Sequence, residues 1–220
     1  MKINMKKEIP CHILLIAAVV ISLWPVVFML SASLKELNQV FQSPLNPLPF
    51  PPTLENYQTV LSRFPIMQFV GNTFFIAFFV RLFKIITSLL AGFAFVYYRF
   101  KGREMLFNCM LMTFFIPVTV LIMPNYLFMS HLGLLNTPYG VILTELADGM
   151  GIFLMRQAMR SIPKALFESA VLEGAGPMCI LRTIVFPLVR PSVIAVGIMF
   201  FINSWNEYFW PLLILKDKSQ

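Results

Sequence analysis

The long apolar runs of this chain most constrain its fold, because several are long enough to cross a lipid bilayer. One transmembrane helix needs about 20 mostly apolar residues. Of the 220 residues, 58% are hydrophobic and only 12% are charged, more apolar surface than one or two small soluble cores can hide. The sequence therefore predicts an all-α membrane protein, a single polytopic helical bundle over residues 1–220 with spans at 11–30, 69–98, 106–128, 139–159 and 191–215.

The first span resembles a secretory signal peptide in its flanks. Three lysines precede it, and Ser31-Ala32-Ser33 imitates a cleavage site. Its uninterrupted apolar run, residues 13–30, is longer than the roughly 7–15 residues of a usual signal core, which favours a retained anchor. The following stretch, residues 35–63, holds five prolines that predict an extended loop without a regular helix: Pro44, Pro47, Pro49, Pro51 and Pro52.

The basic residues between the spans predict the topology. Alternate crossing places eleven of them on one side of the membrane and four on the other. Because Lys and Arg are enriched in cytoplasmic segments, the N terminus and residues 161–187 are expected inside the cell, in a multi-pass inner-membrane protein. The majority side holds Lys2, Lys6, Lys7, Arg99, Lys101, Arg103, Arg156, Arg160, Lys164, Arg182 and Arg190, and the minority side Lys35, Arg63, Lys216 and Lys218.

Other function classes find little support in the composition. The basic residues are dispersed between apolar runs, so the net charge of +7 does not indicate a nucleic-acid partner. Three cysteines and two histidines lie far apart without paired spacing, so we expect no metal site and no disulfide framework. The chain also lacks a glycine-rich phosphate loop. We therefore expect a protein without catalytic residues or a cofactor, with membrane lipid as its main surroundings.

Residues 161–187 predict two short helices joined by a sharp turn. Ser161 is a good N-cap two residues before Pro163, which suits a first helical turn. Gly174 stands where a residue of positive φ would end the helix, and Gly176-Pro177 would begin another. With a small apolar face at helical spacing, such an element suits docking into a groove on a soluble partner.

The same segment holds a longer spaced pattern: Glu168-Ser169-Ala170, then Gly174 after three residues, then Ile184-Val185-Phe186-Pro187 after nine more. This pattern resembles the cytoplasmic coupling loop of ATP-binding-cassette importer permeases, which has Glu-Ala-Ala, three residues, Gly, nine residues, then Ile-x-Leu-Pro. Three positions depart modestly from the pattern: Ser169 for Ala, Glu173 for Asp, and Phe186 for Leu. Further stretches resemble the carbohydrate-importing, maltose-type branch: Asn72-Thr73, Arg99-Phe100-Lys101-Gly102-Arg103, Gly133-Leu134-Leu135-Asn136-Thr137 and Ser204-Trp205-Asn206-Glu207-Tyr208.

The resemblance implies a transport subunit without chemistry of its own. Such permeases convert ATP-driven closure of a nucleotide-binding dimer into alternating access. By position, Glu168 would pair with a basic residue of the ATPase, Ala170 would let the helix sit deep in its cleft, and Gly174 would set the angle between the helices. The implied partners are two ATP-binding subunits, a second permease subunit and an extracytoplasmic solute-binding protein.

Four ionisable residues fall inside predicted spans, where charges are expensive and usually functional. Arg81 and Lys84 lie three apart in the second span, and Glu145 and Asp148 lie three apart in the fourth, so each pair is expected on one helix face. They could form an interhelical ion pair. Alternatively, Lys84 extends to the interface and the acids face a water-filled vestibule. A proton relay is the third alternative.

A polar and aromatic cluster lies near the outer end of the fifth span. Sugar recognition combines amide and carboxylate partners for hydroxyls with an aromatic face for the ring. The cluster provides this combination, although Trp and Tyr at this depth also form interfacial belts. We take it as a candidate translocation path: Asn203, Trp205, Asn206 and Glu207.

The favoured interpretation is therefore a permease subunit of an ATP-driven, binding-protein-dependent sugar importer. Two alternatives stay open, an ion-coupled secondary transporter using the intramembrane charges and a non-transporting membrane scaffold. Five spans would leave the C terminus outside, whereas the resembled family usually has six. The last five residues are too few to cross a bilayer, so we expect either a shortened product or another chain that supplies the missing surface.

Overall fold

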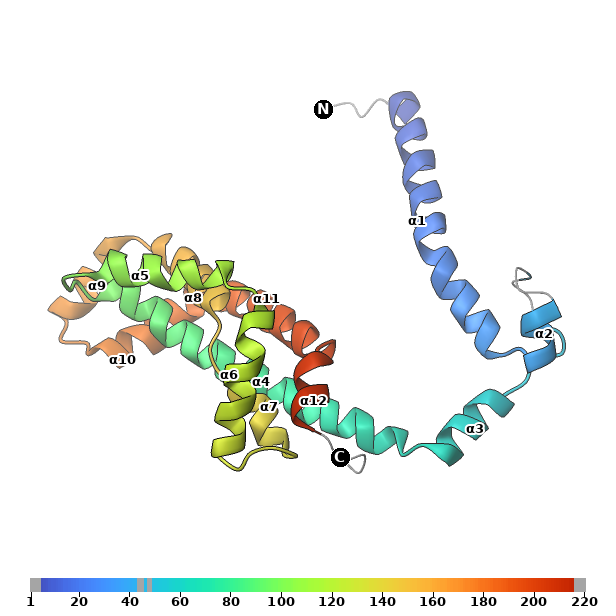
Figure 1. Cartoon of the computed structure of the whole chain (residues 1–220). Helices are drawn as coiled ribbons and strands as arrows, with labels where there is room; N and C mark the ends of the chain where they lie inside the picture. Colours follow the sequence, from blue (N-terminus) through green and yellow to red (C-terminus); the bar gives the residue numbers. More distant parts are fainter. Residues whose placement is uncertain (1–4, 43–45, 47–48, 216–220) are drawn as a thin grey trace. The chain divides into compact units, whose positions relative to one another are not determined.

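The computed structural model describes residues 5–42, 46 and 49–215, which form two units (Figure 1). Unit 1 ends at Ile66, and unit 2 begins at Met67. All regular secondary structure in the described residues is helical, which confirms the predicted all-α class.

Unit 1 is built on one long apolar helix. Helix α1 (Met5–Ser33) includes the predicted first span, and its described apolar side chains are almost all exposed. A helix with this surface is suited to lipid or to other membrane helices as its surroundings. Polar contacts hold its C-terminal end: the Asn56 amide donates to the carbonyls of Ser33 (3.1 Å) and Lys35 (2.7 Å).

The proline-rich stretch is more helical than predicted. The expectation of no regular helix in residues 35–63 is wrong, because α2 (Leu37–Gln42) and α3 (Glu55–Arg63) both lie within it. The five prolines all fall between these two helices, in residues 44–52. Proline excludes helix only locally, so the residues outside that interval were free to form helices.

Unit 2 is organised along helix α4 (Ile66–Tyr97), which runs from one end of the unit to the other. Two apolar cores lie along it. Near its start, Ile76 and Val80 pack with residues of α6, α7 and α12. Near its end, Phe93 packs with residues of α8, α9 and α11. We call these the α12 end and the α9 end of unit 2. The remaining bounds are α5 (Arg103–Met112), α6 (Val118–His131), α7 (Pro138–Thr144), α8 (Gly149–Arg160), α9 (Lys164–Leu172), α10 (Pro177–Ile180), α11 (Phe186–Trp205) and α12 (Phe209–Ile214).

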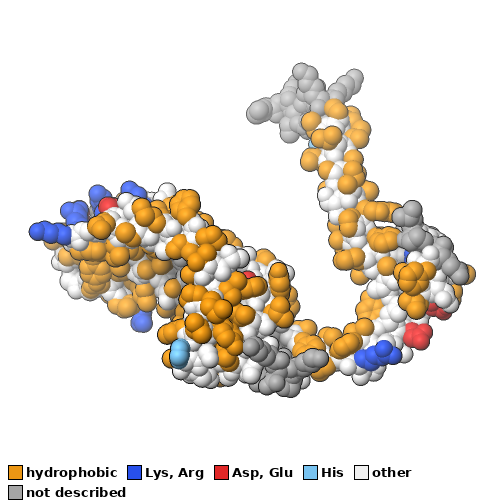
Figure 2. Space-filling model, in the orientation of Figure 1, with side chains coloured by type: hydrophobic (Ala, Val, Ile, Leu, Met, Phe, Trp, Pro, Cys, Tyr) orange, Lys and Arg blue, Asp and Glu red, His pale blue; other side chains and the backbone are white. Residues whose placement is uncertain are grey.

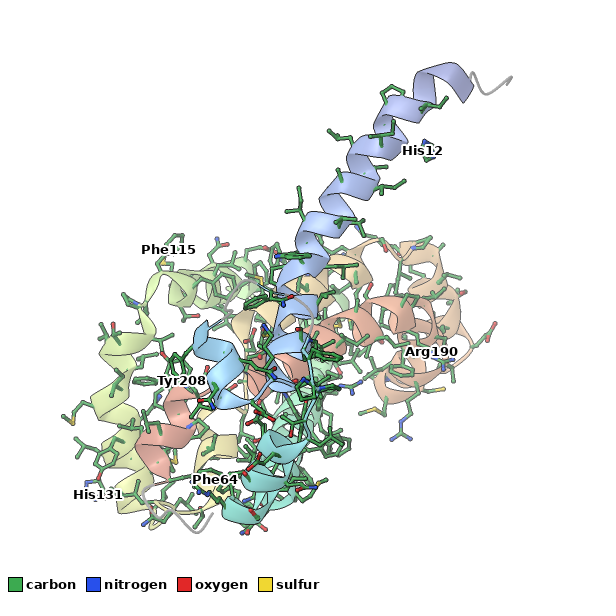
Figure 3. All side chains as sticks on the ribbon, turned by 90° about the vertical axis from the view of Figure 1, so that its right-hand side faces the viewer. His12, Phe64, Phe115, His131, Arg190 and Tyr208 are labelled. Atoms are coloured by element: carbon green, nitrogen blue, oxygen red, sulfur yellow. The ribbon has the colours of Figure 1, made fainter. Side chains whose placement is uncertain are left out.

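The predicted third span, residues 106–128, is bent by 100° between α5 and α6. Pro117 caps α6, and Ile116 before it has an extended backbone (φ −81°, ψ 116°). Proline disfavours helical geometry in the residue before it, which explains the break. Figure 3 shows Phe115 at this bend and His131 at the far end of α6.

The predicted fourth span, residues 139–159, is two short helices instead of one. Helix α7 ends at Thr144, and α8 begins at Gly149 with Asp148 as its N-cap. The backbone N–H of Gly151 donates to Asp148 Oδ1 at 2.9 Å. Helix α7 contacts α12, whereas α8 contacts α5 and α11, so together they still connect the two ends of unit 2.

The predicted fifth span, residues 191–215, has different bounds in the structure. One helical rod runs over Pro177–Trp205, and α12 follows as a separate short helix. The rod widens into a π-helical turn at Leu181–Val185. Pro187 lacks the N–H that would bond to the carbonyl of Thr183, which accounts for the wider turn.

Three helices in the described residues are long and apolar enough to cross a membrane. The bent α5–α6 pair would be a fourth, if it crosses as one broken segment. Two of the five predicted spans, residues 106–128 and 139–159, are thus interrupted helices in the structure. The three helices are Ile9–Ser33, Ile66–Tyr97 and Pro177–Trp205.

Candidate functional site

Basic side chains gather at the α9 end of unit 2, while the rest of the face shown in Figure 2 is largely hydrophobic. A cleft of about 1040 Å³ opens there between the end of α4, the start of α5, α8 and α9. Two carboxylates, Glu104 and Glu168, also line it. Its positive side chains outnumber these acids: Arg99, Arg103, Arg156, Arg160 and Lys164.

The helix–turn–helix predicted for residues 161–187 is present beside this cleft. Helix α9 ends at Leu172, and Gly174 has φ +79°, which confirms the expected positive value. The N–H of Ala175 bonds to the carbonyl of Ala170 (2.9 Å), and that of Gly174 to the carbonyl of Val171 (3.0 Å). These two bonds form a Schellman motif, in which glycine is favoured because it alone has no Cβ to strain.

The motif residues divide between surface and core. Glu168 and Ser169 are exposed, and Leu172 at the tip of α9 is 89% exposed. Ala170 is only 6% exposed and packs inside the chain with residues of α8 and α11. Its small side chain therefore allows close packing of α9 on its own unit. Farther along, Ile184 lies half-buried in the π-helical turn, and Pro187 lies exposed at the start of α11.

One detail of this segment was predicted wrongly. Ser161 is the C-cap of α8, and its hydroxyl donates to the carbonyl of Ala158 at 2.7 Å. Pro163 is the N-cap of α9, so the helix begins two residues later than expected. The preceding helix takes up Ser161 because α8 continues to Arg160.

Three of the four intramembrane charges meet at the break between α7 and α8. Lys84 Nζ lies 2.6 Å from Glu145 Oε2 and 3.8 Å from Asp148 Oδ2. Lys84 is only 9% exposed, and its ammonium lies 5.6 Å from the centre of the Phe200 ring. The acids come together because the chain breaks between them, and not because they share a helix face. Arg81 is absent from this cluster.

A second ion pair was not anticipated from the sequence. Arg156 Nη2 lies 2.8 Å and 2.7 Å from the two carboxylate oxygens of Glu104, and its guanidinium carbon lies 3.8 Å from the centre of the Phe107 ring. The sequence pattern marks Arg156 only as a topology signal, although its side chain is buried. The partners are 52 residues apart, and no local pattern in the sequence points to their contact.

The candidate translocation cluster is partly occupied by contacts within the chain. Glu207 Oε1 accepts the N–H of Phe209 (2.8 Å) and of Trp210 (3.4 Å) at the start of α12. The Asn206 amide donates to the carbonyl of Ile202 at 2.8 Å. Asn203 and Trp205 stay exposed, as does Tyr208, which is labelled in Figure 3.

These features define a class of protein: a helical membrane bundle that presents a helix–turn–helix at its basic end. Residues 84–218 match the family described as binding-protein-dependent transport system inner membrane component. The chain belongs to this family.

Named relatives agree with this membership. The chain is 34% identical to the sn-glycerol-3-phosphate transport system permease protein UgpE of Yersinia pestis, over 96% of this chain and 78% of that protein. It is 34% identical to the UgpE protein of Salmonella typhi, over 94% and 75%. A crystal structure of a bacterial ABC transporter involved in the import of the polysaccharide alginate has a similar fold, with a TM-score of 0.79 at 24% identity, over 99% of this chain and 77% of that one.

The family membership favours the importer permease over the two alternatives, the secondary transporter and the scaffold. Family members are multi-pass membrane transport components, which work with ATPase and binding-protein partners.

Proposed function

We propose that this chain is one of two permease subunits in an ATP-driven importer of a sugar or sugar-like polyol, and that the α9–Gly174–α10 element docks on an ATPase. One observation carries the proposal: Glu168 and Leu172 are exposed on α9. This helix ends in the Schellman motif and lines the basic cleft. The name of the UgpE relatives, which refers to a phosphorylated polyol, supports the solute class.

In this proposal the α9 end faces the cytoplasm. The sequence assigns eleven basic residues to the inner side of the membrane. Most of those that the structure describes lie at or near the α9 end, which supports an N-terminus-in topology. Two ATPase subunits, a second permease chain and an extracytoplasmic binding protein would complete the assembly. The exposed apolar surface of α1 and of unit 2 is available to lipid and to the second permease.

Two of the motif residues would act through the element's shape. Ala170 would hold α9 close to α8 and α11. A displacement of α9 by the ATPase would then move these three helices together. Gly174 would fix the direction of α10. Glu168 would supply the charged contact to a basic residue of the ATPase, with Ser169, Ile184 and Pro187 shaping its surroundings.

Site-directed photo-crosslinking tests the docking. In the purified, reconstituted importer, Cys11, Cys109 and Cys179 are replaced by Ser, and a benzophenone maleimide is attached at Leu172→Cys. Leu212→Cys, also highly exposed but at the α12 end, is the matched control. We expect a crosslink to the ATPase from position 172 and none from 212. A crosslink from 212 alone, or from neither position in an active complex, would contradict the proposal.

A further inference from the structure

Four aromatic rings of α4 and α11 form a continuous row on unit 2, which we call the aromatic seam. Phe78 stacks on Phe74 with ring centres 6.2 Å apart. Phe74 meets Phe201 edge-on at 5.9 Å, and Phe201 stacks on Trp205 at 5.8 Å. Phe74, Phe78 and Trp205 are between 38% and 52% exposed. The seam is therefore accessible along its length and reaches the candidate translocation cluster at Trp205.

Arg81 continues the aromatic seam on α4. It follows Phe78 by three residues, so the two side chains lie on one helix face. Its guanidinium lies over Gly197 of α11, where an added Cβ would stand 3.2 Å from Nε and 3.4 Å from Nη2. Ile85 Cδ1 would lie nearer still, at 2.7 Å, so the missing side chain at Gly197 leaves space that Ile85 and the guanidinium share. Gly197 precedes Phe201 by four residues, so α11 contributes to the same surface.

The charge of Arg81 is not balanced within the described residues. No hydrogen bond or ion pair joins its guanidinium to another described residue, although it lies fifteen residues after the start of the 32-residue helix α4. The two acids of the charge cluster at the α7–α8 break, Glu145 and Asp148, face Lys84. At mid-membrane depth an arginine is too costly to expose to lipid, so this face meets water, protein or solute.

We propose that the aromatic seam and Arg81 form the surface on which the transported solute contacts this chain, and that the solute is a polyhydroxylated anion, carrying a phosphate or a carboxylate. This inference rests on the proposed importer function. Aromatic faces pack against the C–H faces of sugars and polyols. The guanidinium fork donates two parallel hydrogen bonds to a phosphate or carboxylate. A neutral sugar would leave the charge of Arg81 unbalanced, so an anion is preferred.

Uptake by the complete importer in proteoliposomes tests the charge preference. The probes are sn-glycerol 3-phosphate, digalacturonate and neutral maltose, each with and without ATP. We expect the wild-type importer to take up one of the two anions and to discriminate against maltose. Uptake of maltose alone would overturn the anion preference and leave the importer function standing. Absence of ATP-dependent uptake of any probe, together with an ATPase that the binding protein does not stimulate, would overturn both.

Variants then test the role of Arg81. Arg81→Gln is expected to lower uptake of the anionic probe at least tenfold, at an unchanged amount of assembled complex, and Arg81→Lys to restore part of it. Arg190→Gln, which removes an exposed arginine at the α9 end of α11, is the control and is expected to transport normally. Normal uptake by Arg81→Gln would overturn the proposal. Loss of the second permease chain from the complex, with unchanged uptake per complex, would place Arg81 at a subunit interface and also overturn it.

Discussion

Lys84 of α4 and Glu145, which follows α7, form an ion pair of 2.6 Å that joins two segments separated by 61 residues. Both side chains are largely buried, at 11% and 13% exposure. Asp148 supports the same ammonium from the other side of the break, at 3.8 Å, and also caps α8. One cation therefore contacts the acids at both ends of the gap between α7 and α8.

Removing one partner of this pair should destabilise the protein strongly. Lys84→Met leaves the buried carboxylate of Glu145 unpaired, which costs about 3–5 kcal/mol. Glu145→Leu should cost less, because Asp148 still lies 3.8 Å from the ammonium of Lys84. The double variant replaces both charges by apolar groups. Its loss of unfolding free energy should be much smaller than the sum of the losses in the two single variants. Thermal unfolding of the purified complex measures this, with exposed Glu173→Gln as the neutral control. Additive losses in the double variant would show that the two charges are not coupled.

The backbone at Gly174 should matter more than the space around it. Gly174 and Gly176 both have open space beside them, but only Gly174 has a positive φ; that of Gly176 is −73°. Gly174→Val should cost about 1–2 kcal/mol of local strain and change the direction of α10, which lowers uptake per ATP hydrolysed. The matched variant Gly176→Val adds the same bulk without this strain. Equal coupling ratios in the two variants would contradict the prediction.

Glu168 should contribute to ATPase binding through its charge. Glu168→Ala is expected to weaken association with the ATPase by about 1.5–3 kcal/mol, because a charge-assisted hydrogen bond is lost. Glu173→Ala removes an exposed acid from the same element and should have a smaller effect. Titration of the ATPase into permease nanodiscs measures both affinities. Identical losses for the two variants would indicate a general charge effect and no specific contact.

Glu207 should act mainly on stability, because its carboxylate accepts two backbone N–H groups at the start of α12. Glu207→Ala is expected to lower the unfolding free energy by about 0.5–2 kcal/mol. Glu207→Gln retains an acceptor oxygen, so its unfolding free energy should fall less than that of Glu207→Ala. Asn203→Ala and Trp205→Ala, by contrast, should lower solute uptake at an unchanged amount of complex. The prediction is contradicted if Glu207→Ala unfolds like the wild type.

Cysteine labelling tests the topology. In a background with the three native cysteines replaced, an impermeant maleimide added outside should reach Asn46→Cys and miss Lys101→Cys. Native Cys179, exposed in the helical rod just after Gly176, gives a second inside position when it alone is restored. Labelling of position 101 from outside, with 46 protected, would reverse the topology.

The sequence by itself determined the membrane class, the all-α fold and the turn at Gly174. These follow from local properties: an apolar run of sufficient length needs no knowledge of its neighbours, and a glycine at fixed spacing in a short helix predicts a left-handed residue. Residues 161–187 were identified for the same reason, since their pattern is contiguous.

Only the tertiary structure decided which distant groups meet. A hydropathy pattern does not reveal that α7 and α8 separate at residues 145–148, because the cost of the break is offset by Lys84, which lies on α4. The partnership of Arg156 with Glu104 and the position of Arg81 over Gly197 likewise join residues with no local signal. The residue type alone determines that burying a charge costs free energy. Which charge or aromatic ring offsets that cost depends on the packing of segments that lie far apart in the chain.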